Sequence, residues 1–168
     1  MLKRLLQTTD DPVFTVIRLV LGLVFFAHGA QKMLGWFGGY GFSGTLSAFS
    51  TSGMPTPLAL FVFFTEFFGS LALICGAFAR VASGAIALLM VGAVTMVHAH
   101  FGFYMNWFGQ QKGEGFEYHL LAIGLAVAIL VRGAGSFSVD GLLSKRMAQG
   151  QEADVFADKV DVIVYSCA

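Results

Sequence analysis

The segment Leu58–Phe78 has the sequence LALFVFFTEFFGSLALICGAF, and Glu66 is the single charged residue within it. A helix that crosses the hydrocarbon core of a bilayer needs about 20 mostly apolar residues, and this segment supplies 21. Backbone polar groups inside lipid must bond to one another, which leaves a helix as the structure of such a continuous apolar run. The segment therefore predicts a membrane-spanning helix that carries one carboxylate.

Three further windows of 20 to 22 residues have the same character: Val13–Leu34, Val81–Phe101 and Phe116–Gly135. Strand-like alternation of apolar and polar residues is absent from them, which disfavours a β-barrel. Only Ala79 and Arg80 separate the second window from the third, so these two helices are expected to form a tight antiparallel hairpin capped by Arg80. The predicted fold class is an all-α integral membrane four-helix bundle.

The composition of the whole chain agrees with this class. Of 168 residues, 57% are hydrophobic and 12% are charged, the formal net charge is zero and the mean hydropathy is +0.75. A soluble domain is nearer 25% charged, so these charges are too few to cover a surface that faces water. The lack of a stripe rich in Lys and Arg disfavours a nucleic-acid partner. Two distant cysteines, Cys75 and Cys167, form neither a disulfide framework nor a metal-binding pair.

The basic residues predict the orientation, because Lys and Arg concentrate in the cytoplasmic flanks of membrane spans. Five of them flank one side of the predicted spans: Lys3, Arg4, Arg80, Lys145 and Arg146. The other side has Lys112 and, at its boundary, Lys32. We therefore expect both termini to be cytoplasmic and the loops 35–57 and 102–115 to face outward. The first window is expected to be a retained helix, because charged residues interrupt the pattern of a signal peptide.

The chain beyond Gly135 is polar and mixed in charge, so a mobile tail is expected there. We place the boundary of the four-helix domain at residues 1–146 and a polar cytoplasmic tail at 147–168.

Glu66 is the sharpest candidate for a functional residue, because an ionisable group inside a span indicates function by default. It lies eight residues from Leu58, which puts it about 12 Å below the outer surface at 1.5 Å per residue. His28 lies about 9 Å below the same surface by the same rise, and Lys32 shares its helical face. A carboxylate, an imidazole and an ammonium are thus expected to meet in the outer half of the bundle, as catalytic residues. An interhelical ion pair that fixes helix register is an equally weighted interpretation of Glu66.

Arg18 lies five residues inside the first window and shares a helical face with Gly22, Phe25 and Gly29. That face is expected to pack inward. For Arg18 itself we expect snorkelling to the headgroups, or packing, rather than catalysis.

The remaining histidines lie at the outer ends of the third and fourth windows, together with Glu117. His98 and His100 are two residues apart, so on a helix they point to opposite sides, and no metal site is predicted from His98, His100, His119 and Glu117. Packing is the favoured role. A proton relay, or hydrogen bonds from His98, Glu117 or His119 to a quinone, stays open.

The order of several short motifs resembles the DoxX family of small bacterial membrane proteins. They are listed here in chain order: Arg18-Leu-Val-Leu-Gly22, His28-Gly-Ala-Gln-Lys32, Glu66, Gly76-Ala-Phe-Ala-Arg80, Gly115-Phe-Glu-Tyr-His119 and Gly133-Ala-Gly-Ser-Phe-Ser-Val-Asp140. The resemblance covers about residues 13–145. It implies a four-helix protein of the bacterial inner membrane, linked to quinone, thiol or oxidative-stress redox systems.

Two functions follow as hypotheses. The first is a quinone-linked redox component or subunit of a membrane oxidoreductase complex, in which His28, Lys32 or Glu66 meets the quinone carbonyls. The second is a non-enzymatic scaffold or assembly subunit for a redox or stress-response complex. The expected partners are the lipid bilayer and soluble or membrane redox proteins, with a homo-oligomer as a further alternative. A transporter is disfavoured because the sequence has no duplicated broken helices.

Overall fold

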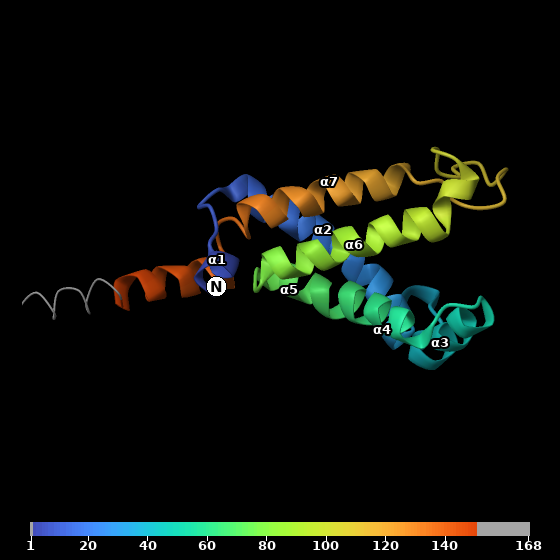
Figure 1. The fold of residues 1–168 in the computed structure, drawn as a ribbon, viewed down its shortest axis with the longest axis horizontal. Helices are drawn as coiled ribbons and strands as arrows, with labels where there is room; N and C mark the ends of the chain where they lie inside the picture. Colours follow the sequence, from blue (N-terminus) through green and yellow to red (C-terminus); the bar gives the residue numbers. More distant parts are fainter. Residues whose placement is uncertain (1, 151–168) are drawn as a thin grey trace, which may run out of the picture.

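The computed structural model describes residues 2–150, and the regular structure in that range is helical (Figure 1). Its elements are, in chain order, α1 (Leu2–Leu6), α2 (Pro12–Leu34), η1 (Trp36–Gly38), α3 (Gly41–Thr51), α4 (Thr56–Phe64), η2 (Thr65–Gly69), α5 (Ser70–Cys75), α6 (Ala79–Met96), η3 (His98–Phe101) and α7 (Glu117–Arg132). Residues 139–150 are also helical. Residues 151–168 of the tail predicted at 147–168, Cys167 among them, lie outside the described residues.

The first predicted span corresponds to α2, whose ends follow local chemistry. The Asp11 carboxylate accepts a hydrogen bond from the Val13 N–H at 2.9 Å, and Pro12 occupies the first helical position, where its missing N–H costs nothing. Gly35 ends the helix with φ +74°, a conformation that favours glycine. The inward face predicted for Arg18, Gly22, Phe25 and Gly29 is buried, as expected.

The second span is one continuous helical run made of α4, η2 and α5. Pro55 precedes its first turn, and Gly76, with φ +68°, ends it. The short turn that follows leads directly into α6, so the predicted hairpin is confirmed.

The sequence predicts an outward-facing loop at 35–57. The prediction of a loop is wrong in one respect, because this segment contains the helix α3. Its Gly-, Ser- and Thr-rich sequence has weak helical propensity, and packing stabilises it instead. The ring centroids of Phe42 and Phe49 lie 4.8 and 6.0 Å from that of Phe63 on α4, and Thr45 is buried against the bundle.

Three helical runs are long and apolar enough to cross a membrane: Pro12–Leu34, Thr56–Cys75 and Ala79–Met96. The third is shorter than predicted, because α6 ends at Met96 and a 3-10 turn follows. Helix α7 has 16 residues, about 24 Å of rise, against a hydrocarbon core of about 30 Å. A fourth complete span stays a prediction.

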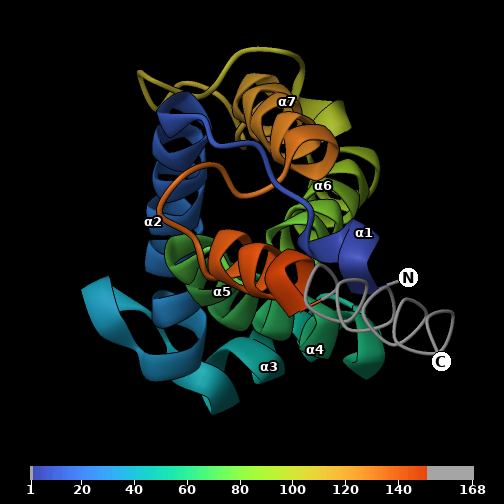
Figure 2. The same ribbon diagram turned by 90° about the vertical axis from the view of Figure 1, so that its left-hand side faces the viewer.

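The helices pack lengthwise. Figures 1 and 2 show α7 beside α6, and α2 lies against α5 and η2 as well as α7. Their shared core consists of side chains that are almost fully buried: Leu21, Phe25, Leu73, Ile86, Ala126 and Ile129.

Arg18 is 1% exposed, so its side chain is packed inside the bundle. Of the two roles predicted for it, packing is confirmed and snorkelling to the headgroups is wrong. Its guanidinium donates hydrogen bonds to the backbone carbonyls of Leu73, Ile74 (2.6 Å), Ala134 (2.9 Å) and Phe137 (3.3 Å). Arginine suits this position because its planar group offers five donors in a fixed arrangement. Arg18 thereby fastens α2 to α5 and to the chain that follows α7.

Asp140 completes this end of the bundle. Its two carboxylate oxygens accept hydrogen bonds from the N–H groups of Phe78 (2.7 Å) and Ala79 (2.9 Å), and so cap α6 from a distant part of the chain. Arg80, expected to cap the hairpin, instead donates to the carbonyls of Gln7 and Leu130. The prediction of a mobile tail after Gly135 is therefore wrong as far as Asp140. The buried residues of this stretch are held against the bundle by hydrogen bonds.

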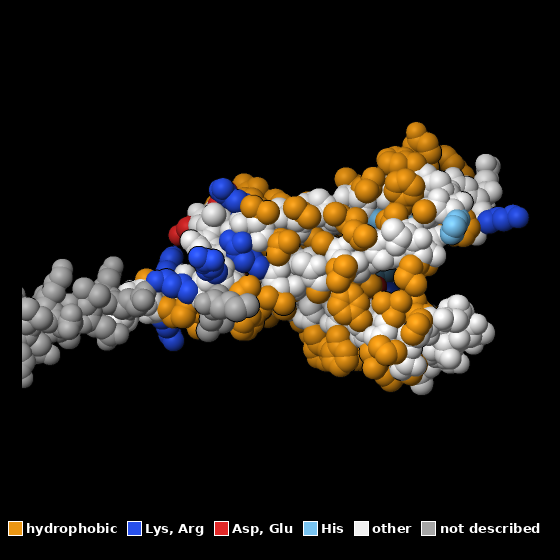
Figure 3. Space-filling view, in the orientation of Figure 1, with side chains coloured by type: hydrophobic (Ala, Val, Ile, Leu, Met, Phe, Trp, Pro, Cys, Tyr) orange, Lys and Arg blue, Asp and Glu red, His pale blue; other side chains and the backbone are white. Residues whose placement is uncertain are grey.

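Basic side chains gather at this same end of the molecule, around α1 and the start of α6, as Figure 3 shows. Hydrophobic side chains cover much of the length between this end and the other.

Candidate functional site

Glu66 lies in η2, where the helix widens to a π turn. Such turns are rare and often occur at functional sites. Gly29 of α2 packs directly on this turn, since a Cβ at Gly29 would lie 2.6 Å from the carbonyl carbon of Glu66 and 2.7 Å from Cα of Phe67. The absence of a side chain at Gly29 therefore lets the two backbones touch, and this contact sets the position of Glu66 relative to α2.

Lys32 lies nearly one turn beyond Gly29 on α2 and pairs with Glu66. Its Nζ lies 2.5 Å from Oε2 of Glu66, and the two side chains are 22% and 9% exposed. Burial of one such charge alone would be costly, so the pair is mutually stabilising once formed. The sequence predicted that a carboxylate, an imidazole and an ammonium could meet here; the structure brings Lys32 and Glu66 together, whereas His28 is exposed on α2.

An apolar pocket of about 600 Å³ opens beside this ion pair. Its walls are mostly apolar side chains of α4 and α6, with Phe49 and Met54 from the segment between α2 and α4. Lys32 and Glu66 are the charged pair among its lining residues, and His98 lines it from the end of α6. The volume falls within the roughly 300–1,000 Å³ range of small-molecule sites, which are typically apolar with a few polar groups.

His98 of η3 forms a ring pair with His119 of α7, although the two residues are far apart in sequence. Their centroids lie 4.1 Å apart, and His98 Nδ1 is 2.8 Å from the Glu114 carbonyl oxygen. His119 is buried, and within residues 2–150 its Nδ1 and the Tyr118 hydroxyl have no hydrogen-bond partner. Buried polar atoms normally have a hydrogen-bond partner, so these two atoms have bonding capacity that the described residues leave unused.

The other predicted site residues lie apart from the pocket. His28 is exposed on α2, with its ring centroid 6.5 Å from that of Tyr118. Glu117 accepts hydrogen bonds from the Met105 N–H and the Trp107 indole, each at 3.0 Å, and so anchors the loop between η3 and α7. His100 is exposed. Among the described residues, no three potential metal ligands come together.

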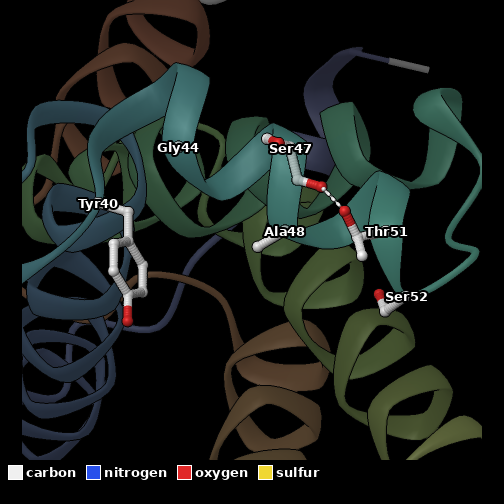
Figure 4. A pocket seen from close by; sticks show the side chains of 6 residues that line it. All are labelled: Tyr40, Gly44, Ser47, Ala48, Thr51 and Ser52. Carbon is white, nitrogen blue, oxygen red and sulfur yellow. Dashed lines mark hydrogen bonds between the residues drawn. The ribbon is translucent and has the colours of Figure 1, made fainter.

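A second hollow of about 500 Å³ lies along α3 and is shown in Figure 4. Its lining consists of Tyr40 and one face of α3, with Thr51 donating a hydrogen bond to the Ser47 carbonyl at 3.0 Å. Most of these side chains are exposed and none is charged, so we place the candidate site in the apolar pocket.

Sequence reasoning missed the apolar part of this site. Met54, Met90 and Met96 line the pocket, yet in the sequence they look like packing or lipid-facing residues. Methionine adapts to irregular cavities, but only the fold brings these three positions together.

Comparison with known proteins addresses the family directly. The family model DoxX matches residues 13–99, slightly more than half of the chain. The chain belongs to the DoxX family. It is also similar to a Bacillus subtilis (strain 168) protein named "Putative oxidoreductase CatD", with 26% identity over 114 residues, which cover 68% of this chain and 75% of the relative. No solved structure gives a significant match.

The motif residues of this DoxX protein divide into two groups in space. Arg18, Arg80 and Asp140 bind backbone groups at the basic end, where their role is structural. Lys32 and Glu66 form the charged pair of the pocket. The second group therefore lines the apolar pocket, where a ligand can contact it.

Proposed function

We propose that this DoxX protein binds a lipid-soluble quinone in the apolar pocket, as a component of an oxidoreductase complex in the bacterial inner membrane. The observation that supports this most is the pocket itself: about 600 Å³ of apolar walls with one charged pair, Lys32 and Glu66, in its lining. The name of the Bacillus subtilis relative, an oxidoreductase, agrees with the proposal.

A quinone fits this lining in chemical terms. Its ring is flat and apolar, and its polar atoms are carbonyl oxygens that accept hydrogen bonds. Within the described chain, Glu66 is the hydrogen-bond partner of Lys32 Nζ, which leaves two of the three ammonium protons free to donate to a carbonyl. His98, also in the lining, supplies a second polar group.

The roles of the residues follow from this arrangement. Lys32 orients the carbonyl, Glu66 holds Lys32 in place and keeps the pocket neutral, and the apolar walls exclude water. A bound quinone supplies the capacity to take up electrons and protons, while redox partner proteins, soluble or in the membrane, supply the electrons.

The orientation is part of the same proposal. The basic end of the molecule faces the cytoplasm by the positive-inside rule, so the pocket lies in the outer half of the membrane. This places the ion pair and His98 nearer the outer aqueous phase than the cytoplasm.

The test is direct quinone binding to the purified full chain in lipid nanodiscs, measured by titration with a short-chain quinone. Lys32→Met removes the proposed donor and should lower affinity at least tenfold, since a hydrogen bond to a charged group contributes about 1.5–3 kcal/mol. Gly92→Leu should block binding, because Gly92 lines the pocket and its Cβ would meet nothing within 4 Å.

Two matched variants serve as controls. Glu114→Gln changes a carboxylate of the outward loop, and Gly124→Leu adds a side chain on α7, also into open space. Both should bind quinone as the wild type does. A wild-type protein that binds no quinone, or equal binding by Lys32→Met and wild type, refutes the proposal.

The direct contact between Lys32 and Glu66 favours a second candidate function. In this function the protein is a non-enzymatic scaffold, and the ion pair only fixes helix register. In that case Glu66→Gln lowers the amount of folded protein or the recovery of its complex, whereas turnover per folded molecule is unchanged. Measuring both quantities in the same membranes separates the two functions.

A further inference from the structure

A groove of about 430 Å³ lies at the basic end of the bundle, at the opposite end of α6 from the proposed quinone pocket. Its lining comes from three helices: Arg4 and Leu5 of α1, Arg80, Val81 and Gly84 of α6, and Leu130 of α7. Two of these residues are cationic and none is acidic. The groove thus offers positive charge beside an apolar floor.

The two arginines are available to an anion. Arg80 is held in place by hydrogen bonds from Nε to the Gln7 carbonyl (3.0 Å) and from Nη1 to the Leu130 carbonyl (2.6 Å). Within residues 2–150 its Nη2 has no hydrogen-bond partner, and neither has the exposed guanidinium of Arg4. Guanidinium groups bind phosphate through paired N–H donors.

The floor of the groove continues into an apolar stripe along α6. Val81, Gly84 and Leu88 lie at spacings of three and four residues, hence on one helical face. Val81 is 52% exposed and Leu88 is 64% exposed. A Cβ at Gly84 would meet only Leu130 Cδ1, at 3.5 Å, so the surface is recessed there. A free phosphate ion would use the arginines and leave this stripe uncovered.

We propose that the groove binds an anionic phospholipid, with its phosphate between Arg4 and Arg80 and an acyl chain along the stripe. The gathering of basic side chains places this end at the cytoplasmic leaflet, whose anionic lipids attract basic groups at the membrane surface. Arg80 is already ordered by its carbonyl contacts, so little freedom is lost on binding. The groove itself shares no lining residue with the apolar pocket, although Leu88 at the far end of the stripe also lines that pocket.

The test is native mass spectrometry of the full chain, delipidated in detergent and then given phosphatidylglycerol or phosphatidylcholine. Arg4→Gln removes one phosphate ligand, and Gly84→Leu fills the recess without changing charge. Arg4→Gln should reduce bound phosphatidylglycerol about fivefold, the effect of one basic group at a membrane surface, and Gly84→Leu should also reduce it, because the added side chain occupies the path of the acyl chain. Arg146→Gln at the same end and Gly124→Leu on α7 are the matched controls, and both should retain the lipid.

Two further results would overturn the proposal. Equal retention of phosphatidylcholine, or equal loss in Arg146→Gln, would show that general surface charge or detergent exchange explains the signal. A competition arm with inorganic phosphate distinguishes the source of the anion: if phosphate displaces the lipid from the wild type and binds Gly84→Leu equally well, the groove is a site for a free anion.

Discussion

Gly29→Ala tests whether the contact between α2 and the π turn determines the geometry of the ion pair. The added Cβ would lie 2.6–2.7 Å from backbone atoms of Glu66 and Phe67, about 1 Å inside the roughly 3.5 Å separation of carbon atoms in contact. Backbone atoms cannot rotate away, so α2 and η2 must separate by about that distance. Overpacking of this kind costs about 1–3 kcal/mol.

The expected loss corresponds to a melting temperature lower by about 2–12 °C for a chain of this size. Thermal unfolding in detergent, followed by the fluorescence of Trp36 and Trp107, measures it. Gly124→Ala is the control, because a Cβ there meets nothing within 4 Å and alanine raises helix propensity by up to about 1 kcal/mol. A Gly29→Ala protein as stable as Gly124→Ala would refute the argument that the two backbones are in contact.

Three further predictions concern the basic end. Arg18→Lys should destabilise the protein by about 2–5 kcal/mol in the same thermal assay, because an ammonium cannot serve four backbone carbonyls and leaves some of them buried without a donor. Asp140→Asn should cost about 1–2 kcal/mol, since one amide oxygen replaces two acceptors at the start of α6, and unchanged unfolding would contradict the capping role. The Ser136 hydroxyl, and after it the Lys145 ammonium, lower the pKa of Asp10 below its usual 3.8. This interaction therefore stabilises the fold above about pH 4 and is lost as the pH falls through the lowered pKa, so Asp10→Asn should flatten the pH dependence of unfolding in acid.

The spanning helices could be predicted from the sequence because the requirement behind them is local. A run of about 20 apolar residues in lipid must satisfy its own backbone, and the windows that start at Val13, Leu58 and Val81 match α2, the run from α4 to α5, and α6. Helix α3 could not be predicted in this way. Its glycines and hydroxyl residues favour a loop by propensity, and packing against Phe63 outweighs that preference.

Some contacts of the candidate site could be predicted from the sequence, and others could not. The approach of Lys32 to Glu66 could be predicted because residue counting places His28 and Glu66 at similar depth and Lys32 shares a helical face with His28. The pairing of His98 with His119 could not, because it depends on how the loop between α6 and α7 returns the chain. The π turn at Glu66 also escaped prediction, since a contact with Gly29 on another helix accompanies it.

The carbonyl contacts of Arg18 have a consequence for biogenesis. Its partners lie in residues 73–74 and 134–137, so the first span emerges from the ribosome long before the last of them is made. Until then a guanidinium in a spanning helix lacks two of its four acceptors, the carbonyls of Ala134 and Phe137, at a cost of up to a few kcal/mol. We expect nascent chains that end before residue 134 to be held at the insertion machinery or degraded, and release into the bilayer to coincide with synthesis of the segment after α7.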